Sequence, residues 1–125
     1  MIYTGYYGRD GTKSNCVGIS AYVPNYLPNV IHVPILAPSL SLVYQINNLQ
    51  ISEEEYKQQF LQLLLERNIP WDLLGNELDG KILCCFEKEG FCHRFIVAEQ
   101  FRKHGFIVEE LQETKHNIDL LFFGE

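Results

Sequence analysis

A short apolar segment bounded by glycines constrains the fold of this chain more than any other feature. Residues Lys81 to Phe86 show no polar alternation and lie between Gly80 and Gly90. Such a run is typical of a strand covered on both faces, as in a parallel sheet. Apolar residues at helical spacing follow over 92–104, and a second strand-like segment follows over 106–110. Strand, crossover helix and strand predict one βαβ unit and therefore an α/β fold.

The rest of the chain alternates between strand-like and helix-like segments. Ser52 and Glu55 form a capping box that predicts a helix over 53–67. The other predicted elements are strands at Ile2–Tyr7, Cys16–Tyr22 and Val30–Val33, a loop at Gly8–Asn15, helices at Ser39–Asn47 and Trp71–Leu78, and a last strand or arm at Ile118–Phe123. We therefore expect a single-domain, three-layer Rossmann-like fold over residues 1–125, with a mostly parallel sheet of four to five strands. Residues 111–125 are expected to form a C-terminal strand or arm.

The composition argues against several classes of protein. A hydrophobic share of 46% and an aromatic share of 13% are those of a folded globular chain. A net charge of −6, with scattered Lys and Arg residues, argues against binding of duplex nucleic acid. The apolar runs are too short to cross a bilayer, so no membrane partner is expected. The N-terminus lacks the pattern of a secretory signal, so we expect a cytoplasmic protein with four reduced cysteines; two disulfides are the alternative for a secreted one.

The segment Cys84–Arg94, CCFEKEGFCHR, concentrates reactive side chains at the end of the predicted buried strand. Ligands of parallel α/β sheets bind beyond the carboxyl ends of the strands. Cys92, His93 and Arg94 open the next helix, where free N–H groups and the helix dipole attract anions and lower the pKa of a thiol. A guanidinium at this position can hold a phosphate or carboxylate at two points.

This motif predicts a site for a small anionic, nucleotide-like ligand, formed by the loop 85–94 and the glycine loop after the first strand. The ligand-binding residues that we expect are Cys85, Lys88, Arg94, Tyr3, Gly5 and Gly8. If the site also reacts, Cys92 is the nucleophile and Glu87 or His93 is the acid–base group. Adjacent helical residues diverge, so Glu87 or Cys85 is a better partner for Cys92 than His93 is. The pattern identifies no cofactor.

Other interpretations of the same residues stay open. A non-catalytic sensor or sponge for a nucleotide signal would use the same loop, with its site at the subunit interface of a homo-oligomer. A metal-dependent enzyme could take ligands from Cys85, Cys92 and His93, but their spacing lacks the C-x2-C clip of structural zinc, so we assign no metal ligand. In a purely structural role, Arg94 would pair with a nearby glutamate and secure the turn.

The same motif resembles a bacterial and phage family. Leu83–Lys88, followed by Gly90–Arg94 and Val97–Glu99, is similar to the hallmark of the domain of unknown function 488 family, a strand ending in L-C-x-E-K and a helix opening in C-H-R. Weaker likenesses, which extend the resemblance over residues 1 to 110, lie at Ile2–Tyr6, Ile19–Ser20, Leu36–Ser39 and Ser52–Phe60.

The resemblance implies an α/β fold and a cytoplasmic setting, and it brings no established reaction. It places the family motif on Cys85, Glu87, Lys88, Cys92, His93 and Arg94. The chain departs from the family pattern at Gly5, where relatives commonly have a serine, and at Pro34–Ile35, which replaces a lysine-bearing stretch. Any role of that serine or lysine is therefore not expected here.

Overall fold

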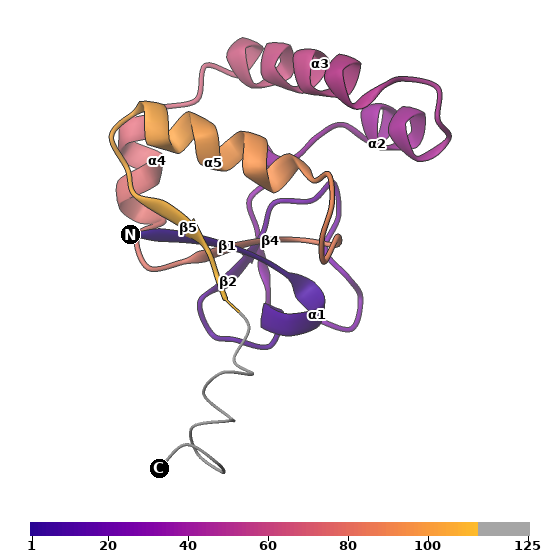
Figure 1. Ribbon diagram of the computed structural model, residues 1–125. Helices are drawn as coiled ribbons and strands as arrows, with labels where there is room; N and C mark the ends of the chain where they lie inside the picture. The colour runs from indigo at the N-terminus through magenta and orange to yellow at the C-terminus, as the bar shows by residue number, and fades with distance from the viewer. Residues whose placement is uncertain (113–125) are drawn as a thin grey trace, which may run out of the picture.

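A parallel sheet forms the centre of the molecule. The computed structural model describes residues 1–112. Within them five strands pair in the order β3-β2-β4-β1-β5, each parallel to its neighbours (Figure 1). Their bounds are β1 Ile2–Tyr6, β2 Cys16–Gly18, β3 Ile31–His32, β4 Ile82–Cys85 and β5 Val108–Glu110. The predicted α/β class and the predicted sheet of four to five strands are confirmed.

The helices lie close to their predicted positions, with one addition. Their bounds are α1 Tyr7–Asp10, a 3-10 turn at Pro34–Leu36, α2 Leu40–Asn47, α3 Glu53–Glu66, α4 Trp71–Glu77 and α5 His93–Lys103. Ser39 and Ser52 accept hydrogen bonds from amides in the first turns of α2 and α3, and Glu55 completes the predicted capping box. The addition is α1, because the segment expected to be a loop begins with one helical turn, closed by the Gly11 amide on the Tyr7 carbonyl.

The N-terminal strand β1 lies between two strands from the C-terminal half of the chain. Tyr3 pairs with Ile82 of β4 on one side and with Glu109 of β5 on the other. The predicted βαβ unit over 81–110 is therefore present as β4, α5 and β5. The two strands of this unit are not neighbours in the sheet, because the crossover through α5 places β5 on the far side of β1 from β4.

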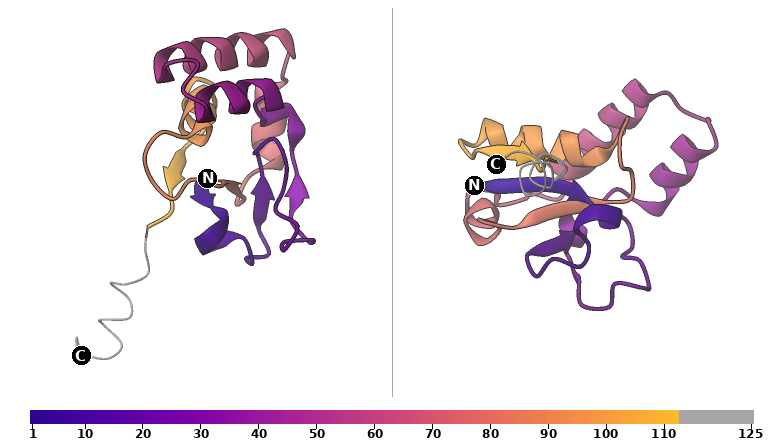
Figure 2. Two further views of the ribbon diagram at one scale, coloured as in Figure 1. Left: turned by 90° about the vertical axis from the view of Figure 1, so that its right-hand side faces the viewer. Right: turned by 60° about the horizontal axis from the view of Figure 1, so that its bottom comes forward.

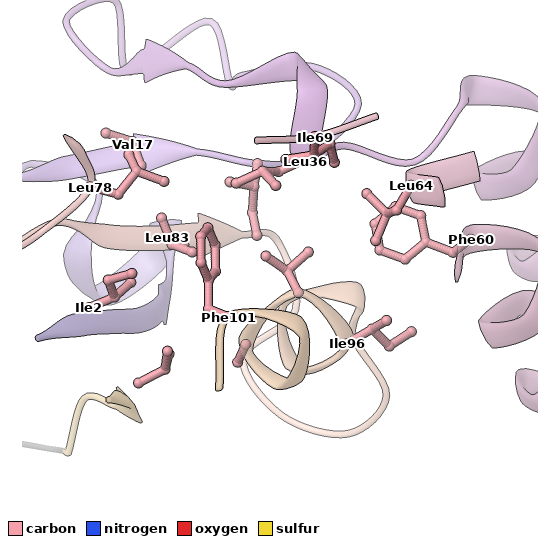
Figure 3. Packing of buried hydrophobic residues seen from close by; sticks show 14 of the residues in the cluster. Ile2, Val17, Leu36, Phe60, Leu64, Ile69, Leu78, Leu83, Ile96 and Phe101 are labelled. Atoms are coloured by element: carbon pink, nitrogen blue, oxygen red, sulfur yellow. The ribbon is translucent and has the colours of Figure 1, made fainter. Parts of the chain in front are cut away.

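Two hydrophobic clusters cover the two faces of the sheet, because neighbouring residues of a strand point to opposite faces. Leu83 of β4 belongs to the larger cluster, where Phe60 of α3 and Phe101 of α5 pack with it (Figure 3). The second cluster consists of Tyr7, Cys16, Leu27, Ile82 and Cys84. Helix α5 and the turn α1 lie on opposite sides of the sheet (Figure 2), which agrees with the predicted three layers.

The chain continues from β5 into the predicted C-terminal strand or arm, of which only the first two residues are described. The Leu111 amide donates to the Thr4 carbonyl at 2.9 Å, so pairing with β1 extends to this residue. The strand or arm predicted at Ile118–Phe123 lies outside the described residues. Within residues 1–112, no helix is both long and apolar enough to span a bilayer.

Candidate functional site

A pocket of about 450 Å³ opens at the carboxyl edge of the sheet. Its walls come from the segment after β2, the turn after β4, helix α2 and the first turns of α3 and α5. The aromatic side chains among the lining residues are Tyr22, Tyr56, Phe86 and Phe91, and the polar or reactive ones include Ser20, Glu53, Glu87, Cys92 and His93. Parallel strands end at a common edge, so the fold brings segments distant in the sequence to one cavity.

The predicted site residues divide into two groups. The three residues predicted to be catalytic, Glu87, Cys92 and His93, all line the pocket. The six predicted to bind ligand, Cys85, Lys88, Arg94, Tyr3, Gly5 and Gly8, are not among its lining residues. Their contacts elsewhere in the fold show what each of them does in this structure.

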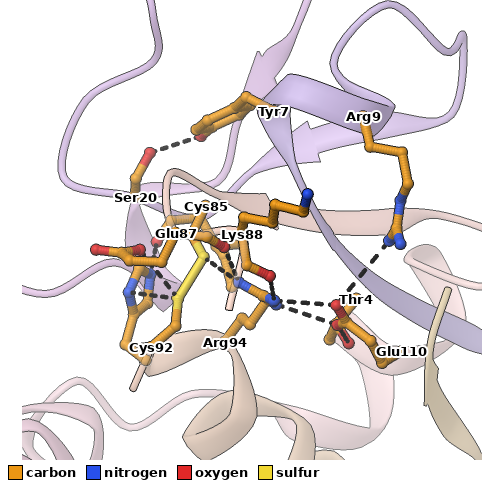
Figure 4. The surroundings of a disulfide bond; sticks show 12 residues. Thr4, Tyr7, Arg9, Ser20, Cys85, Glu87, Lys88, Cys92, Arg94 and Glu110 are labelled. Atoms are coloured by element: carbon orange, nitrogen blue, oxygen red, sulfur yellow. Dashed lines mark hydrogen bonds and ion pairs between the residues drawn. A yellow bond between two sulfur atoms is a disulfide. The ribbon is translucent and has the colours of Figure 1, made fainter. Parts of the chain in front are cut away.

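Arg94 is almost wholly buried beneath the turn, and its donors are all used within the protein (Figure 4). Nε and Nη2 donate to the two carboxylate oxygens of Glu110, at 3.1 and 3.0 Å. Nη1 donates to the Glu87 carbonyl and to Sγ of Cys85, and Nη2 also donates to the Lys88 carbonyl. A guanidinium has five N–H donors, so this arrangement leaves none for an incoming anion.

Cys85 and Cys92 form a disulfide across the turn (Figure 4). The prediction of four reduced cysteines is therefore wrong for this pair, and it holds for Cys16 and Cys84, which are free and buried. Cys84 and Cys85 point to opposite faces of the sheet, as expected for neighbours in a strand. The sequence did not predict this disulfide, because the spacing of Cys85 and Cys92 in the chain is not that of a recognisable cysteine motif. The turn that brings the two residues together is not evident from the sequence.

Cys92 has two closer partners than its neighbour His93. Its Sγ lies 3.2 Å from Oε2 of Glu87 and 3.9 Å from Nδ1 of His93. Glu87 and Cys85 therefore both reach Cys92 across the turn, which agrees with the geometry expected from the sequence. The thiol of a reduced Cys92 would have a carboxylate in hydrogen-bonding distance as a proton acceptor.

The imidazole of His93 is buried and neutral. Its Nε2 lies 2.7 Å from the carbonyl of Ile19, and since a carbonyl only accepts, Nε2 carries the proton. Burial lowers the pKa of His93 to about 4, with a smaller contribution from the nearby Arg94 cation. The lone pair of Nδ1 is therefore directed to the side of the ring where Cys92 lies.

The glycine loop after β1 surrounds a buried carboxylate instead of a ligand. A Cβ on Gly5 would collide with Oδ2 of Asp10, whereas a Cβ on Gly8 would have ordinary contacts with the ring of Tyr6. Tyr3 packs against the second hydrophobic cluster. These three predicted ligand-binding residues thus build the face of the sheet opposite α5.

The two cations of this loop pair with Asp10. Nε of Arg9 and Nζ of Lys13 lie 2.9 and 2.8 Å from its carboxylate oxygens. Burial alone would raise the pKa of Asp10, but the two cations outweigh it and hold this pKa below its usual range. The loop is consequently stabilised as an internal ion-pair network.

The charge of the pocket differs from the charge expected of an anion site. Glu53 and Glu87 are among its lining residues, and no Lys or Arg side chain is. Burial, together with the Glu87 carboxylate, raises the pKa of Tyr56 above its usual range, so its hydroxyl stays protonated. The lining therefore offers negatively charged acceptors to a ligand, with aromatic surface beside them.

Sequence reasoning missed the contribution of α3 to the pocket. The rings of Tyr22 and Phe86 contact each other at a tilt of 48°, with centroids 5.2 Å apart, and Tyr56 meets Phe91 edge-on at the same centroid distance. The aromatic residues of the N-terminal third were a partial signal for Tyr22. No local pattern places Glu53 and Tyr56 at the turn after β4, because this depends on how the α2–α3 pair folds back over the sheet.

One group of side chains could hold a metal ion. Sγ of Cys85, Sγ of Cys92 and a carboxylate oxygen of Glu87 lie within 4.8 Å of one another, and no other group of three such ligands occurs among residues 1–112. Two soft donors and one carboxylate form a set that suits Zn²⁺ when the cysteines are reduced.

Comparisons with known proteins add no name to this site. No family model matches the chain, and no curated protein or solved structure matches it either. The resemblance to the domain of unknown function 488 family stays a prediction that depends on the motif residues. The site is therefore described by its architecture, a Rossmann-like α/β fold with a pocket at the carboxyl edge of a parallel sheet.

Proposed function

We propose that this protein binds a small, planar, nucleotide-like ligand and that the base of that ligand occupies the pocket at the carboxyl edge. The observation that carries the proposal is the lining itself, in which aromatic side chains lie beside two carboxylates. Aromatic rings stack on the face of a base, and carboxylates accept hydrogen bonds from its amino and ring N–H groups. A volume of about 450 Å³ is within the range of small-molecule sites.

The charge of the lining determines how such a ligand would be oriented. Glu53 and Glu87 would repel a phosphate inside the pocket, and the guanidinium of Arg94 is already fully bonded. The anionic part of a nucleotide-like ligand would therefore lie outside the cavity, in solvent. A neutral base or nucleoside would bind at least as well as its phosphorylated form.

Cysteine-dependent chemistry is a second candidate, favoured by the 3.2 Å approach of the Glu87 carboxylate to Cys92. In the reduced protein, the Cys92 thiol would transfer its proton to Glu87 and present a thiolate to the ligand. Cys85, linked to Cys92 in this structure, must be released first. After reduction, carboxymethylation of Cys92 at a rate well above that of Cys16, and its slowing in Glu87→Gln, would support this candidate.

The binding proposal is tested by calorimetric titration with a panel of bases, nucleosides and nucleotides. Tyr22 and Glu53 are exposed residues of the lining, so replacing them leaves the core intact. We expect Tyr22→Ala and Glu53→Gln each to weaken binding of the best ligand about 5- to 100-fold, the range given by one lost base stack or charged hydrogen bond.

A matched control of the same residue type lies within four positions of each of these residues in the chain. Tyr26 is an exposed tyrosine and Glu54 an exposed glutamate, and neither lines this pocket. Tyr26→Ala and Glu54→Gln should bind as the wild type does. Equal losses in the lining and control variants, or tighter binding of inorganic phosphate than of any base, would refute the proposal.

A further inference from the structure

We propose that, once its disulfide is reduced, this protein binds one Zn²⁺ through Cys85, Cys92 and Glu87. The three ligand atoms already lie within 4.8 Å of one another. Ligand atoms of one tetrahedral zinc are about 3–4 Å apart, since Zn–S and Zn–O bonds are about 2.3 and 2.0 Å long. Small rotations of the two thiol side chains are enough to place all three around one ion.

The backbone spacing of the two cysteines suits a bridging ion. Their Cα atoms lie 7.6 Å apart, whereas disulfides usually span about 4.4–6.8 Å between Cα atoms. A zinc ion between two thiolates allows a wider separation than a direct sulfur–sulfur bond does. The same backbone can therefore hold the reduced pair around a metal.

Groups around the three ligands have the arrangement of an outer coordination shell. Nη1 of Arg94 lies 2.9 Å from Sγ of Cys85, where it would offset the charge of a bound thiolate. His93 donates from Nε2 to the Ile19 carbonyl, as metal-ligating histidines donate to an outer acceptor. Its Nδ1, 3.9 Å from Sγ of Cys92, is thereby the side of the ring available for coordination.

The position of the cluster gives the metal access to the pocket. Cys92 and Glu87 line the cavity, while Cys85 lies behind them and is fully buried. A three-ligand zinc keeps one coordination position for water, a substrate atom or His93. This inference goes beyond ligand binding, and it holds whether or not a base enters the pocket.

Loading the site takes two balanced steps. A dithiol reductant first converts the Cys85–Cys92 disulfide into two thiols and is itself oxidised to a cyclic disulfide. Zn²⁺ then displaces the two thiol protons, which pass to the buffer, and bonds to both sulfurs and to the Glu87 carboxylate.

The other cysteine pair provides an internal control. Sγ of Cys16 and Sγ of Cys84 lie 3.2 Å apart and both side chains are buried. They have no third ligand group within reach among the described residues.

The test is a titration of the full chain, reduced without oxygen, with Zn²⁺ in competition with a chromogenic chelator. We expect one equivalent to bind, and Co²⁺ in its place to give the thiolate charge-transfer absorption of a tetrahedral site. Cys92→Ser should abolish binding, and Cys16→Ser should retain it. The disulfide-bonded protein should take up no zinc.

Glu87 provides a variant that does not disturb folding, because its side chain is exposed. Glu87→Gln should bind zinc about tenfold or more weakly while melting at the wild-type temperature. Absence of stoichiometric zinc in the reduced wild type, or equal losses in Cys16→Ser and Cys92→Ser, would overturn the proposal. Unchanged zinc affinity in Glu87→Gln would show that the Glu87 carboxylate is not a zinc ligand.

Discussion

Arg94 illustrates how a residue typical of anion sites can serve as internal support. Its guanidinium joins α5 to β5 through Glu110 and to the turn after β4 through two carbonyls. Glu110 in turn accepts a hydrogen bond from Thr4 of β1 at 2.6 Å. One buried cation thus determines the shape of the turn that carries Glu87, and the pocket wall is formed before any ligand arrives.

Replacing Arg94 with lysine should destabilise the protein although the charge is kept. Lysine has three donors and no planar fork, so at least two charged or carbonyl hydrogen bonds are lost. We expect the free energy of unfolding to fall by about 2–3 kcal/mol in urea titrations. Arg102, which donates to the Val108 carbonyl and is exposed, is the control. An equal loss in Arg102→Lys would contradict the central role of Arg94.

Gly5 is required by the close approach of Asp10, so a side chain at this position would destabilise the protein. A Cβ would collide with the Asp10 carboxylate and lie 2.9 Å from Cγ2 of Ile82. We expect Gly5→Ala to lower the free energy of unfolding by about 1–3 kcal/mol, the usual cost of overpacking. Gly8→Ala, whose Cβ would have contacts of 3.5 Å, should melt within a degree or two of the wild type. Thermal melts of both variants test this prediction, and equal melting temperatures for Gly5→Ala and Gly8→Ala would refute it.

Burial of His93 makes the stability of the protein depend on pH. Its pKa falls from an ordinary 6.5 to about 4 on folding, so between these values the unfolded chain binds a proton that the folded chain does not. Stability is therefore full above about pH 6.5 and declines as the pH falls toward 4, by about 3 kcal/mol in total.

This dependence can be separated from that of the carboxylates by comparing variants. Urea titrations from pH 7.5 to 4.5 should give a shallower decline for His93→Gln than for the wild type. Parallel curves for the wild type and His93→Gln would show that His93 is protonated equally in both states.

At the scale of elements, sequence patterns predicted those helices and strands whose ends depend on residues close by in the chain. The capping box at Ser52 predicted the start of α3, and the apolar run predicted β4. The position of β1 between β4 and β5 had no such signal, because it depends on contacts between residues far apart in the chain. The residues that α3 contributes to the pocket wall were not predicted, for the same reason.

Removing the cap of α3 should have a measurable but limited cost. The Ser52 hydroxyl accepts from the Glu55 amide at 3.1 Å. We expect Ser52→Ala to lower the free energy of unfolding by about 1 kcal/mol. Ser41→Ala, in the first turn of α2 where Ser39 is the cap, should change it by less than about 0.5 kcal/mol. Equal effects would mean that the capping box contributes nothing specific.

At the scale of the whole molecule, charge limits the choice of partners. The net charge is −6, and the loop cations Arg9 and Lys13 are committed to Asp10. The sequence predicted an anion at the carboxyl edge of the sheet, whereas the pocket there is lined by the carboxylates of Glu53 and Glu87. Strand-end position and residue type locate a site, whereas the direction of each side chain depends on the tertiary fold.

Duplex DNA should therefore not bind. We expect no shift in fluorescence anisotropy of a labelled duplex at physiological salt, because scattered cations on a protein of net charge −6 release few counterions from the phosphates. A basic protein of similar size serves as the positive control. Binding that weakens linearly with the logarithm of salt concentration would contradict this expectation.

The placement of β1 in the sheet has a consequence for synthesis of the protein. Residues 2–6 leave the ribosome well before the strands on both sides of them, β4 and β5. The nascent chain therefore carries β1 unpaired until residues 82–110 have been translated. The centre of the sheet consequently forms late instead of growing from β1.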